Sequence, residues 1–147
     1  MSLFERARRV IEEAKREVGE VGVREVECRG YRVVDLETGE VLEESYELQL
    51  FCPAPGGWLY VNFEDPSDVV SGSSPEDLYR NLLLRATVHD IEWAEKYCGR
   101  AERALREGDG DLYRHYAGYC EDGLRELEED LRRLDKLRRG KLRVELI

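Results

Sequence analysis

The sequence has few of the side chains on which common catalytic and metal sites depend. It contains two histidines and one methionine, and its four cysteines include no Cys-x-x-Cys pair. The zinc-protease, serine-hydrolase and phosphate-loop motifs are absent as well. His89 and His115 are predicted to point outward from helices, and neither has the preceding glutamate of a di-iron bundle. We therefore expect no metal, no cofactor and no enzymatic activity, although a deep pocket lined by several carboxylates would favour an enzyme.

Long apolar runs are absent too, since no stretch approaches the roughly 20 residues that span a bilayer. The segment from Met1 to Arg6 lacks the hydrophobic core of a secretory signal. These absences predict a cytoplasmic protein without a membrane partner. The chain has only two asparagines and one glutamine. This depletion of thermolabile residues fits a thermophile, while a GC-rich genome gives the same bias.

Acidic residues are unevenly distributed along the chain. Residues 17–74 carry 13 acids and three bases, which accounts for the whole net charge of −10, while the remaining residues balance 20 acids with 20 bases. Nucleic acid is an unsuitable direct partner, because its binding depends on Lys and Arg that neutralise phosphates. A basic protein surface is more suitable. The alternative is that the acids only maintain solubility and prevent strand edges from pairing.

The segment from Ser74 to Gly140 predicts two long antiparallel helices joined at Gly108-Asp109-Gly110. Heptads can be placed so that each a residue of one helix meets a d residue of the other, which strongly indicates a hairpin. The predicted pairs are Leu105 with Tyr113, Ala101 with Ala117, Cys98 with Cys120, Ala94 with Leu124, Ile91 with Leu127, Thr87 with Leu131, and Leu84 with Leu134.

The opposed Cys98 and Cys120 are flanked by alanines, which permit the close backbone approach that a disulfide needs. A disulfide and a pair of buried thiols both fit this pattern. Cytosolic disulfides are rare outside hyperthermophiles. Cys28 and Cys52 do not fall opposite each other in the register that the intervening turn implies, so the sequence predicts no bond between them.

A second apolar stripe, rich in aromatic residues, follows the g edges of both predicted helices. Its members are Leu83, Ala86, Trp93, Tyr97, Ala104, Leu112, Tyr116, Tyr119, Gly123 and Leu137. A two-helix unit with such a face needs another layer to cover it. We expect the sheet and the first helix to provide that cover. The alternative is an exposed aromatic patch for a partner.

The N-terminal half predicts a helix followed by a β-meander. Ser2 and Glu5 have the spacing of a capping box, and apolar residues then recur at helical spacing as far as Gly19. Strands are predicted over residues 23–34, 41–52 and 58–63, followed by a loop over residues 64–73. Residues 141–147 alternate and predict a final strand. The result is one α+β domain over residues 1–147, divided at residues 73 and 140.

One segment is similar to a known family. Phe63-Glu64-Asp65-Pro66 and the stretch Ser71–Asp77 resemble the strand-to-helix junction of HicB-type antitoxins, mostly through generic loop and cap residues. Proteins of that family act by binding a basic effector, so the resemblance implies one way in which an acidic α+β protein can function.

The leading hypothesis is a non-catalytic inhibitor that binds a basic partner, such as a nuclease or a toxin-like effector, through an acidic hairpin. An antitoxin and a mimic of nucleic-acid charge both fit this hypothesis. The predicted partner-binding residues are Glu37, Glu40, Glu43, Glu44 and Glu47. The alternative is an assembly module that forms a homodimer through its helices. Acids on the e edges oppose a tight self-pair there: Glu95, Glu102, Glu121, Glu128 and Asp135.

Overall fold

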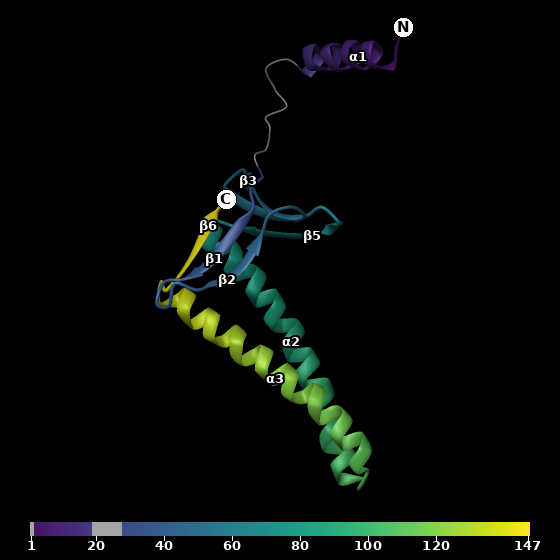
Figure 1. Cartoon of the computed structure of the whole chain (residues 1–147), viewed down its shortest axis with the longest axis vertical. Coiled ribbons are helices and arrows are strands. Elements are labelled where there is room, and N and C mark those ends of the chain that lie inside the picture. The colour runs from purple at the N-terminus through teal and green to yellow at the C-terminus, as the bar shows by residue number, and fades with distance from the viewer. Residues whose placement is uncertain (1, 19–27) are drawn as a thin grey trace.

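The computed structural model of the chain describes residues 2–18 and 28–147. The elements are α1 (Leu3–Val18), β1 (Tyr31–Asp35), β2 (Val41–Ser45), β3 (Gln49–Ala54), β4 (Gly57–Asn62), β5 (Asp65–Gly72), α2 (Pro75–Arg106), α3 (Gly110–Arg138) and β6 (Leu142–Leu146). Two antiparallel three-stranded sheets lie at one end of the long α2–α3 hairpin (Figure 1). The α+β class, the helical hairpin and the terminal strand are confirmed.

The first sheet has the strand order β2-β1-β6. The predicted terminal strand β6 pairs with β1 in antiparallel register, with Val33 opposite Val144. Alternate residues of β1 are buried, namely Tyr31, Val33 and Asp35. A strand from the end of the chain therefore completes a sheet that begins near residue 31.

A three-stranded antiparallel meander is present, but β3, β4 and β5 form it, whereas β1 and β2 belong to the other sheet. The prediction that the strands over residues 23–34, 41–52 and 58–63 share one sheet is therefore wrong. The predicted strand over residues 41–52 ends at Ser45 and resumes at Gln49, and the predicted loop over residues 64–73 is mostly strand β5. Pro53 and Pro66 are compatible with pairing because β3 and β5 are edge strands, which need fewer backbone N–H donors. Residues 23–27 of the predicted first strand lie outside the described residues.

The core lies between the two sheets and the first turns of α2. Phe51, Leu78 and Val33 are its largest fully buried side chains. The rings of Tyr31 and Phe51 stack with their centroids 4.2 Å apart, which joins one sheet to the other. Leu142 and Val144 of β6 belong to the same buried cluster. The core is therefore built where the strands of the N-terminal half meet the start of α2 and the strand β6 that follows α3.

The hairpin begins, turns and ends at the residues that its capping signals predict. Ser74 accepts a hydrogen bond from the Asp77 amide at the start of α2, and Asp109 accepts one from the Leu112 amide at the start of α3. Gly108 has a φ of +74°, a conformation that glycine adopts without steric cost and that lets the chain reverse here. The predicted turn around Asp109 is therefore confirmed.

The seam between the two helices is rotated from the predicted a–d register. The a residues Leu84, Ile91, Leu105, Leu124 and Leu131 are exposed. Small d and g residues are buried instead, including Ala94, Ala101, Ala104 and Gly123. The rotation turns the g edge of α2 at Leu83 toward the sheets, where it joins the core. The prediction that the a residues of both helices are buried between them is therefore wrong.

Helix α1 does not provide the predicted cover for the hairpin. Ser2 caps it, since the Glu5 amide donates to the Ser2 hydroxyl at 3.2 Å. Its apolar side chains are exposed, with Leu3 and Phe4 at 74% and Val10 and Ile11 above 50%. The predicted packing of α1 against the sheet and the hairpin is therefore wrong, and its apolar stripe has no partner among the described residues.

Candidate functional site

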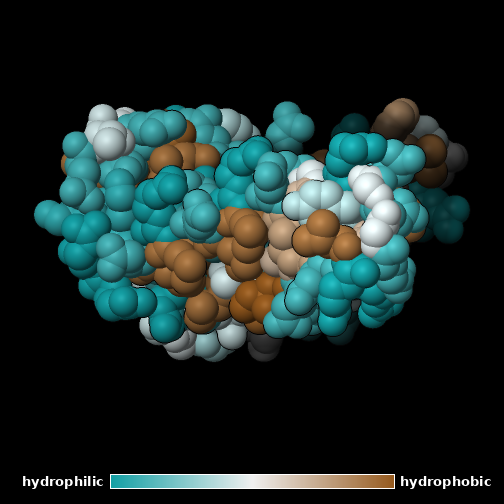
Figure 2. Space-filling model, turned by 90° about the horizontal axis from the view of Figure 1, so that it is seen from below, coloured by the Kyte–Doolittle hydropathy of each residue, from teal (hydrophilic) through white to brown (hydrophobic). Residues whose placement is uncertain are grey.

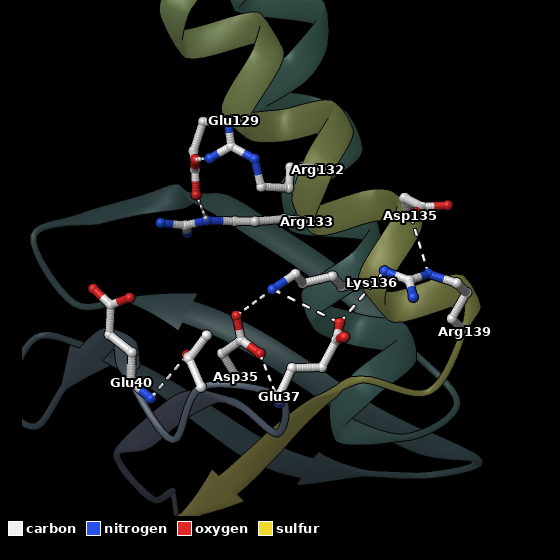
Figure 3. A network of polar contacts seen from close by, with 10 residues as sticks. Asp35, Glu37, Glu40, Glu129, Arg132, Arg133, Asp135, Lys136 and Arg139 are labelled. Atoms are coloured by element: carbon white, nitrogen blue, oxygen red, sulfur yellow. Dashed lines mark hydrogen bonds and ion pairs between the residues drawn. The ribbon is translucent and has the colours of Figure 1, made fainter.

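The five predicted partner-binding glutamates lie in the turn after β1, on β2 and in the bend that follows β2. We call them the acidic edge: Glu37, Glu40, Glu43, Glu44 and Glu47. Three of its five glutamates are engaged within the molecule. Glu37 pairs with Arg139 at 3.4 Å and Lys136 at 3.8 Å, as Figure 3 shows. Glu43 pairs with Arg133 at 3.5 Å. Basic residues of α3 therefore pair with two of the five predicted partner-binding glutamates.

Glu44 is engaged in the same way, with its carboxylate 2.7 Å from Arg32 Nε. Hydrogen bonds from Tyr46 and Arg32 lower the pKa of Glu44 below its ordinary value. Glu40 and Glu47 are exposed and form no ion pair within the described part of the chain. These two carboxylates are the accessible remainder of the predicted site, whose role in partner binding stays a prediction.

Two disulfides are present. Cys98 and Cys120 are bonded with their Cα atoms 4.6 Å apart, and join α2 to α3. Cys28 and Cys52 are bonded as well, with a Cα separation of 4.1 Å, so the prediction that they do not pair is wrong. The turn sets the β1–β2 register only as far as Ser45. Beyond it the chain bends, and β3 pairs with Arg29 through reciprocal hydrogen bonds of Phe51.

An apolar surface runs along one side of the hairpin. It consists of five aliphatic side chains that are between 37% and 60% exposed, and we call it the hairpin strip: Leu84, Val88, Ile91, Leu124 and Leu131. Figure 2, which views the molecule from the hairpin end, shows apolar residues gathered in a band with hydrophilic residues on both sides. The hairpin strip exists because the seam is rotated, which leaves the a residues outside the core.

Acidic residues border the hairpin strip on the e edges of both helices. We call them the acidic rim: Glu95, Glu102, Glu121, Glu128 and Asp135. All five side chains are exposed. Asp135 pairs with Arg139 at 3.0 Å, whereas the other four form no ion pair among the described residues. The acidic rim therefore keeps most of its charge available, in contrast to the acidic edge.

The aromatic stripe lies on the opposite, g-edge side of the hairpin. Trp93, Tyr97 and Tyr119 form a surface cluster, with ring centroids 4.5 to 6.0 Å apart. The Trp93 indole donates to the Tyr119 carbonyl at 3.3 Å. Trp93 and Tyr119 are about 40% exposed, so the predicted cover by the sheets does not extend this far.

A cleft lies between the two sheets and the part of the hairpin nearest to them. It encloses about 490 Å³ and is lined by side chains from four strands and both long helices. Four of the lining residues are carboxylic acids, namely Glu43, Asp90, Glu126 and Asp130. The last three were not predicted from the sequence as members of a site. One feature of the sequence distinguishes them: they are charged residues at the helical positions that the aromatic stripe otherwise fills with apolar side chains.

Asp130 is the most buried of these acids. It is 7% exposed, and its Oδ2 has no hydrogen-bond partner within the described residues. Burial, together with a hydrogen bond to Asp90 and the negative charges of Asp90 and Glu126, raises the pKa of Asp130 to about 7. Arg133 acts in the opposite direction. The cleft thus holds a carboxyl group that changes its charge near neutral pH.

Comparisons with known protein families, with curated proteins and with solved structures give no match. No group of three or more His, Cys, Asp and Glu side chains suited to a metal ion occurs in residues 2–18 and 28–147. In the same residues, no helix has both the length and the apolar character required to cross a membrane. The surfaces described above are therefore the features of the molecule that bear on its function.

Proposed function

We propose that this protein is a non-catalytic binding module that holds a basic amphipathic helix of a partner protein on the hairpin strip. The observation that carries the proposal is the combination of exposed aliphatic side chains with a border of five exposed acids, four of which form no ion pair among the described residues. Docking of an amphipathic helix into an apolar groove is a common mode of protein recognition. A partner with lysine or arginine beside its apolar stripe matches the acidic rim.

The two parts of the surface contribute differently to binding. Burial of a large aliphatic side chain contributes about 1 kcal/mol or more, so the hairpin strip supplies most of the affinity. The exposed charges of the acidic rim accelerate encounter and select basic partners, and salt screens their effect. Glu40 and Glu47 on the acidic edge add to this steering. A nuclease or a toxin-like effector is the class of basic partner that we favour.

A pair of helical peptides tests the proposal. Both carry leucines on one face, and the residues beside that face are lysine in the first peptide and glutamate in the second. We expect the lysine peptide to bind more tightly, and its affinity to fall as salt rises from about 50 to 500 mM. Fluorescence anisotropy measures both affinities. Equal binding of the two peptides would contradict the proposal.

Substitutions locate the binding surface. Leu124→Glu places a charge on the hairpin strip and should weaken the lysine peptide about tenfold or more. Tyr119→Glu is the matched control, because Tyr119 is similarly exposed on α3 but lies in the aromatic cluster. It should leave the affinity nearly unchanged. If Leu124→Glu binds as well as the unchanged protein, the hairpin strip is not the docking surface.

Self-assembly is the second candidate, and α1 favours it. This helix exposes Val10 and Ile11 on its apolar stripe, and places Arg8 and Lys15 beside it. In a homodimer, α1 of one copy would lie on the hairpin strip of the other. Sedimentation velocity over a concentration series tests this arrangement. Ile11→Glu should abolish the dimer and leave lysine-peptide binding intact, whereas Leu124→Glu should abolish both.

A cytoplasmic, thermophilic origin is also part of the proposal. It requires two disulfides to persist in a cytosol, as disulfides do in hyperthermophiles. Acid quenching of intact host cells, followed by alkylation and mass spectrometry, measures the state of all four cysteines. Fully alkylated Cys98 and Cys120 would show that this disulfide does not persist in the cell, and would contradict the thermophilic part of the proposal.

A further inference from the structure

Figure 1 shows that α2 and α3 diverge toward the sheets. Residues of both helices at this end, together with residues of four strands, line the cleft. Tyr31, Tyr60 and Tyr79 contribute aromatic walls, and Leu82 and Leu83 add aliphatic ones. With a volume of about 490 Å³, the cleft has the size of sites that take small molecules. The residues that line it include none of the hairpin strip.

Both arginines that line the cleft are already engaged. The Arg133 guanidinium donates to the Tyr79 hydroxyl at 3.0 Å, and also pairs with Glu43 and Glu129. Arg85 pairs with Asp68 at 2.5 Å. These contacts satisfy Glu43 but provide no direct cation for Asp90, Glu126 or Asp130 among the described residues. Three carboxylates therefore converge on the cleft without a basic partner.

Asp130 indicates that this arrangement is incomplete. A polar atom that is buried without a hydrogen bond is costly, and structures rarely leave one in this state. The Oδ2 atom of Asp130 is such an atom, and Asp130 lines the cleft. A donor that enters the cleft would satisfy Oδ2 and offset the cost of burying this carboxylate.

We propose that the cleft binds an alkylammonium group, with Asp90, Glu126 and Asp130 accepting its hydrogen bonds. An ammonium group is compact and carries three N–H donors, which matches three converging acceptors. The planar guanidinium group is better suited to paired, bidentate contacts. The aliphatic stem of the ligand would lie against Tyr60, Tyr79 and Leu82, because such stems pack on apolar and aromatic surfaces.

Ammonium binding is coupled to a proton on Asp130. The titratable and charged groups that line the cleft with this carboxyl come from five elements: Tyr79, Arg85 and Asp90 on α2, Glu126 and Arg133 on α3, Tyr31 on β1, Glu43 on β2 and Tyr60 on β4. Asp90 and Glu126 favour the protonated form, and a bound ammonium favours the charged form. Binding should therefore release a proton near neutral pH, and affinity should rise between about pH 6 and pH 8.

Titration calorimetry of the full chain tests the proposal with 1,4-diaminobutane, and with 1,4-butanediol as its neutral counterpart. At pH 8 we expect saturable binding of the diamine, no binding of the diol, and weaker binding at pH 6. Buffers of different ionisation enthalpy reveal the released proton. Nα-acetyl-lysine methylamide provides a second probe. Tighter binding of the diamine assigns a free amine as ligand, whereas tighter binding of the lysine derivative assigns a lysine side chain.

Two variants locate the ammonium site. Asp130→Asn keeps the shape of the side chain and should weaken diamine binding about tenfold or more. Glu128→Gln removes an acid of the same helix from the acidic rim and should have little effect. Asp90→Asn provides a second test with the same expected loss if Asp130→Asn does not fold. Leu124→Glu should leave diamine binding unchanged, so this proposal and the proposed function can fail separately.

Three results would overturn the ammonium site. The first is the absence of saturable diamine and lysine-derivative binding up to about 10 mM, a concentration well above that of a functional site. The second is equal binding of the diamine and the diol. The third is equal diamine affinity of the Asp130→Asn variant and the unchanged protein. Any of them would leave the three carboxylates with a structural role alone.

Discussion

The side-chain ammonium of Lys136 on α3 binds the carboxylate of Asp35 on β1, which lies 101 positions earlier in the chain (Figure 3). Asp35 is 4% exposed and also accepts a hydrogen bond from the Glu37 amide at 2.9 Å. This contact joins the first sheet to the end of the helical hairpin. The Lys136–Asp35 contact fixes the position of α3 relative to the first sheet, because a buried carboxylate is stable only beside its charged partner.

Replacement of Lys136 by Met should destabilise the protein, because it leaves the Asp35 carboxylate buried without its cation. The hydrogen bond from Lys136 holds the pKa of Asp35 below its ordinary value. The pair therefore stabilises the fold above about pH 4, and this contribution is lost as pH falls through the lowered pKa. Urea unfolding should show a larger loss for Lys136→Met at pH 7 than at pH 3.

Arg139→Met is the matched control for this substitution. Arg139 also pairs with the turn after β1, through Glu37 at 3.4 Å, but both partners are more than 40% exposed. Exposed pairs contribute little to stability, so its loss should stay below about 1 kcal/mol. If the two substitutions lower the free energy of unfolding equally at pH 7, burial of Asp35 does not strengthen its ion pair with Lys136.

The two disulfides should each stabilise the protein substantially. They close loops with sequence separations of 24 and 22 residues. The chain-entropy relation gives about 3 kcal/mol for loops of this length. A double substitution Cys98→Ala and Cys120→Ala should lower the free energy of unfolding by about that amount, as should Cys28→Ala with Cys52→Ala. Chemical denaturation measures each loss, and reduction of the unchanged protein should approach the combined effect.

Gly123 permits the close approach of α3 to α2. A Cβ atom at this position would lie 2.9 Å from a ring carbon of Trp93 and 3.3 Å from the Ala94 Cα atom. Gly118 lies on the same helix with nothing within 4 Å of its added Cβ. Gly118→Ala should stabilise the protein by about 0.5–1 kcal/mol through helix propensity. Gly123→Ala should lose that gain, and Gly123→Val should destabilise by about 1–3 kcal/mol.

Thermal and urea unfolding of these three variants measure the difference. A stabilising Gly123→Ala substitution would show that the helices separate without cost at this layer. The Gly118→Ala variant serves as the internal standard, because it reports the propensity gain of the same residue change on the same helix.

The hairpin was predictable from the sequence because its signals are local. The cap at Ser74, the glycine beside Asp109 and the heptad spacing each act within a few residues, and each has its expected place in the structure. The rotation of the seam was not predictable, because it depends on what the sheets cover. Periodicity gives the apolar stripes of a helix but does not decide which stripe faces its partner.

The error at Cys28 and Cys52 has a similar cause. A β-hairpin register predicts pairing only while the strands stay straight, and the bend after Ser45 transfers the chain to another sheet. Contacts between residues far apart in the sequence also explain why only part of the predicted acidic site remains accessible. Charge counted along the sequence places Glu37 and Glu43 in an acidic segment, whereas the fold brings Arg139 and Arg133 of α3 to them. Pairing over long sequence distances determines which charges remain available.

Ionisation of the Asp130 carboxyl should make the free energy of unfolding fall as pH rises toward neutrality. Its pKa is raised to about 7 in the folded protein, so the folded state holds a proton that the unfolded state has already lost above pH 4. The unfolded state therefore binds fewer protons between about pH 4 and pH 7, and the contribution of Asp130 to stability falls as pH rises through this range.

The substitution Asp130→Asn removes this pH dependence. We expect the variant to be more stable than the unchanged protein by about 1–2 kcal/mol at pH 8, a discounted value because solvent enters the cleft, and to match it near pH 4. Asp122→Asn on the exposed side of α3 is the control and should change stability by less than about 0.5 kcal/mol at either pH. Urea unfolding at the two pH values decides the matter, because a variant with no advantage at pH 8 would mean that the Asp130 carboxylate is not destabilising in the fold.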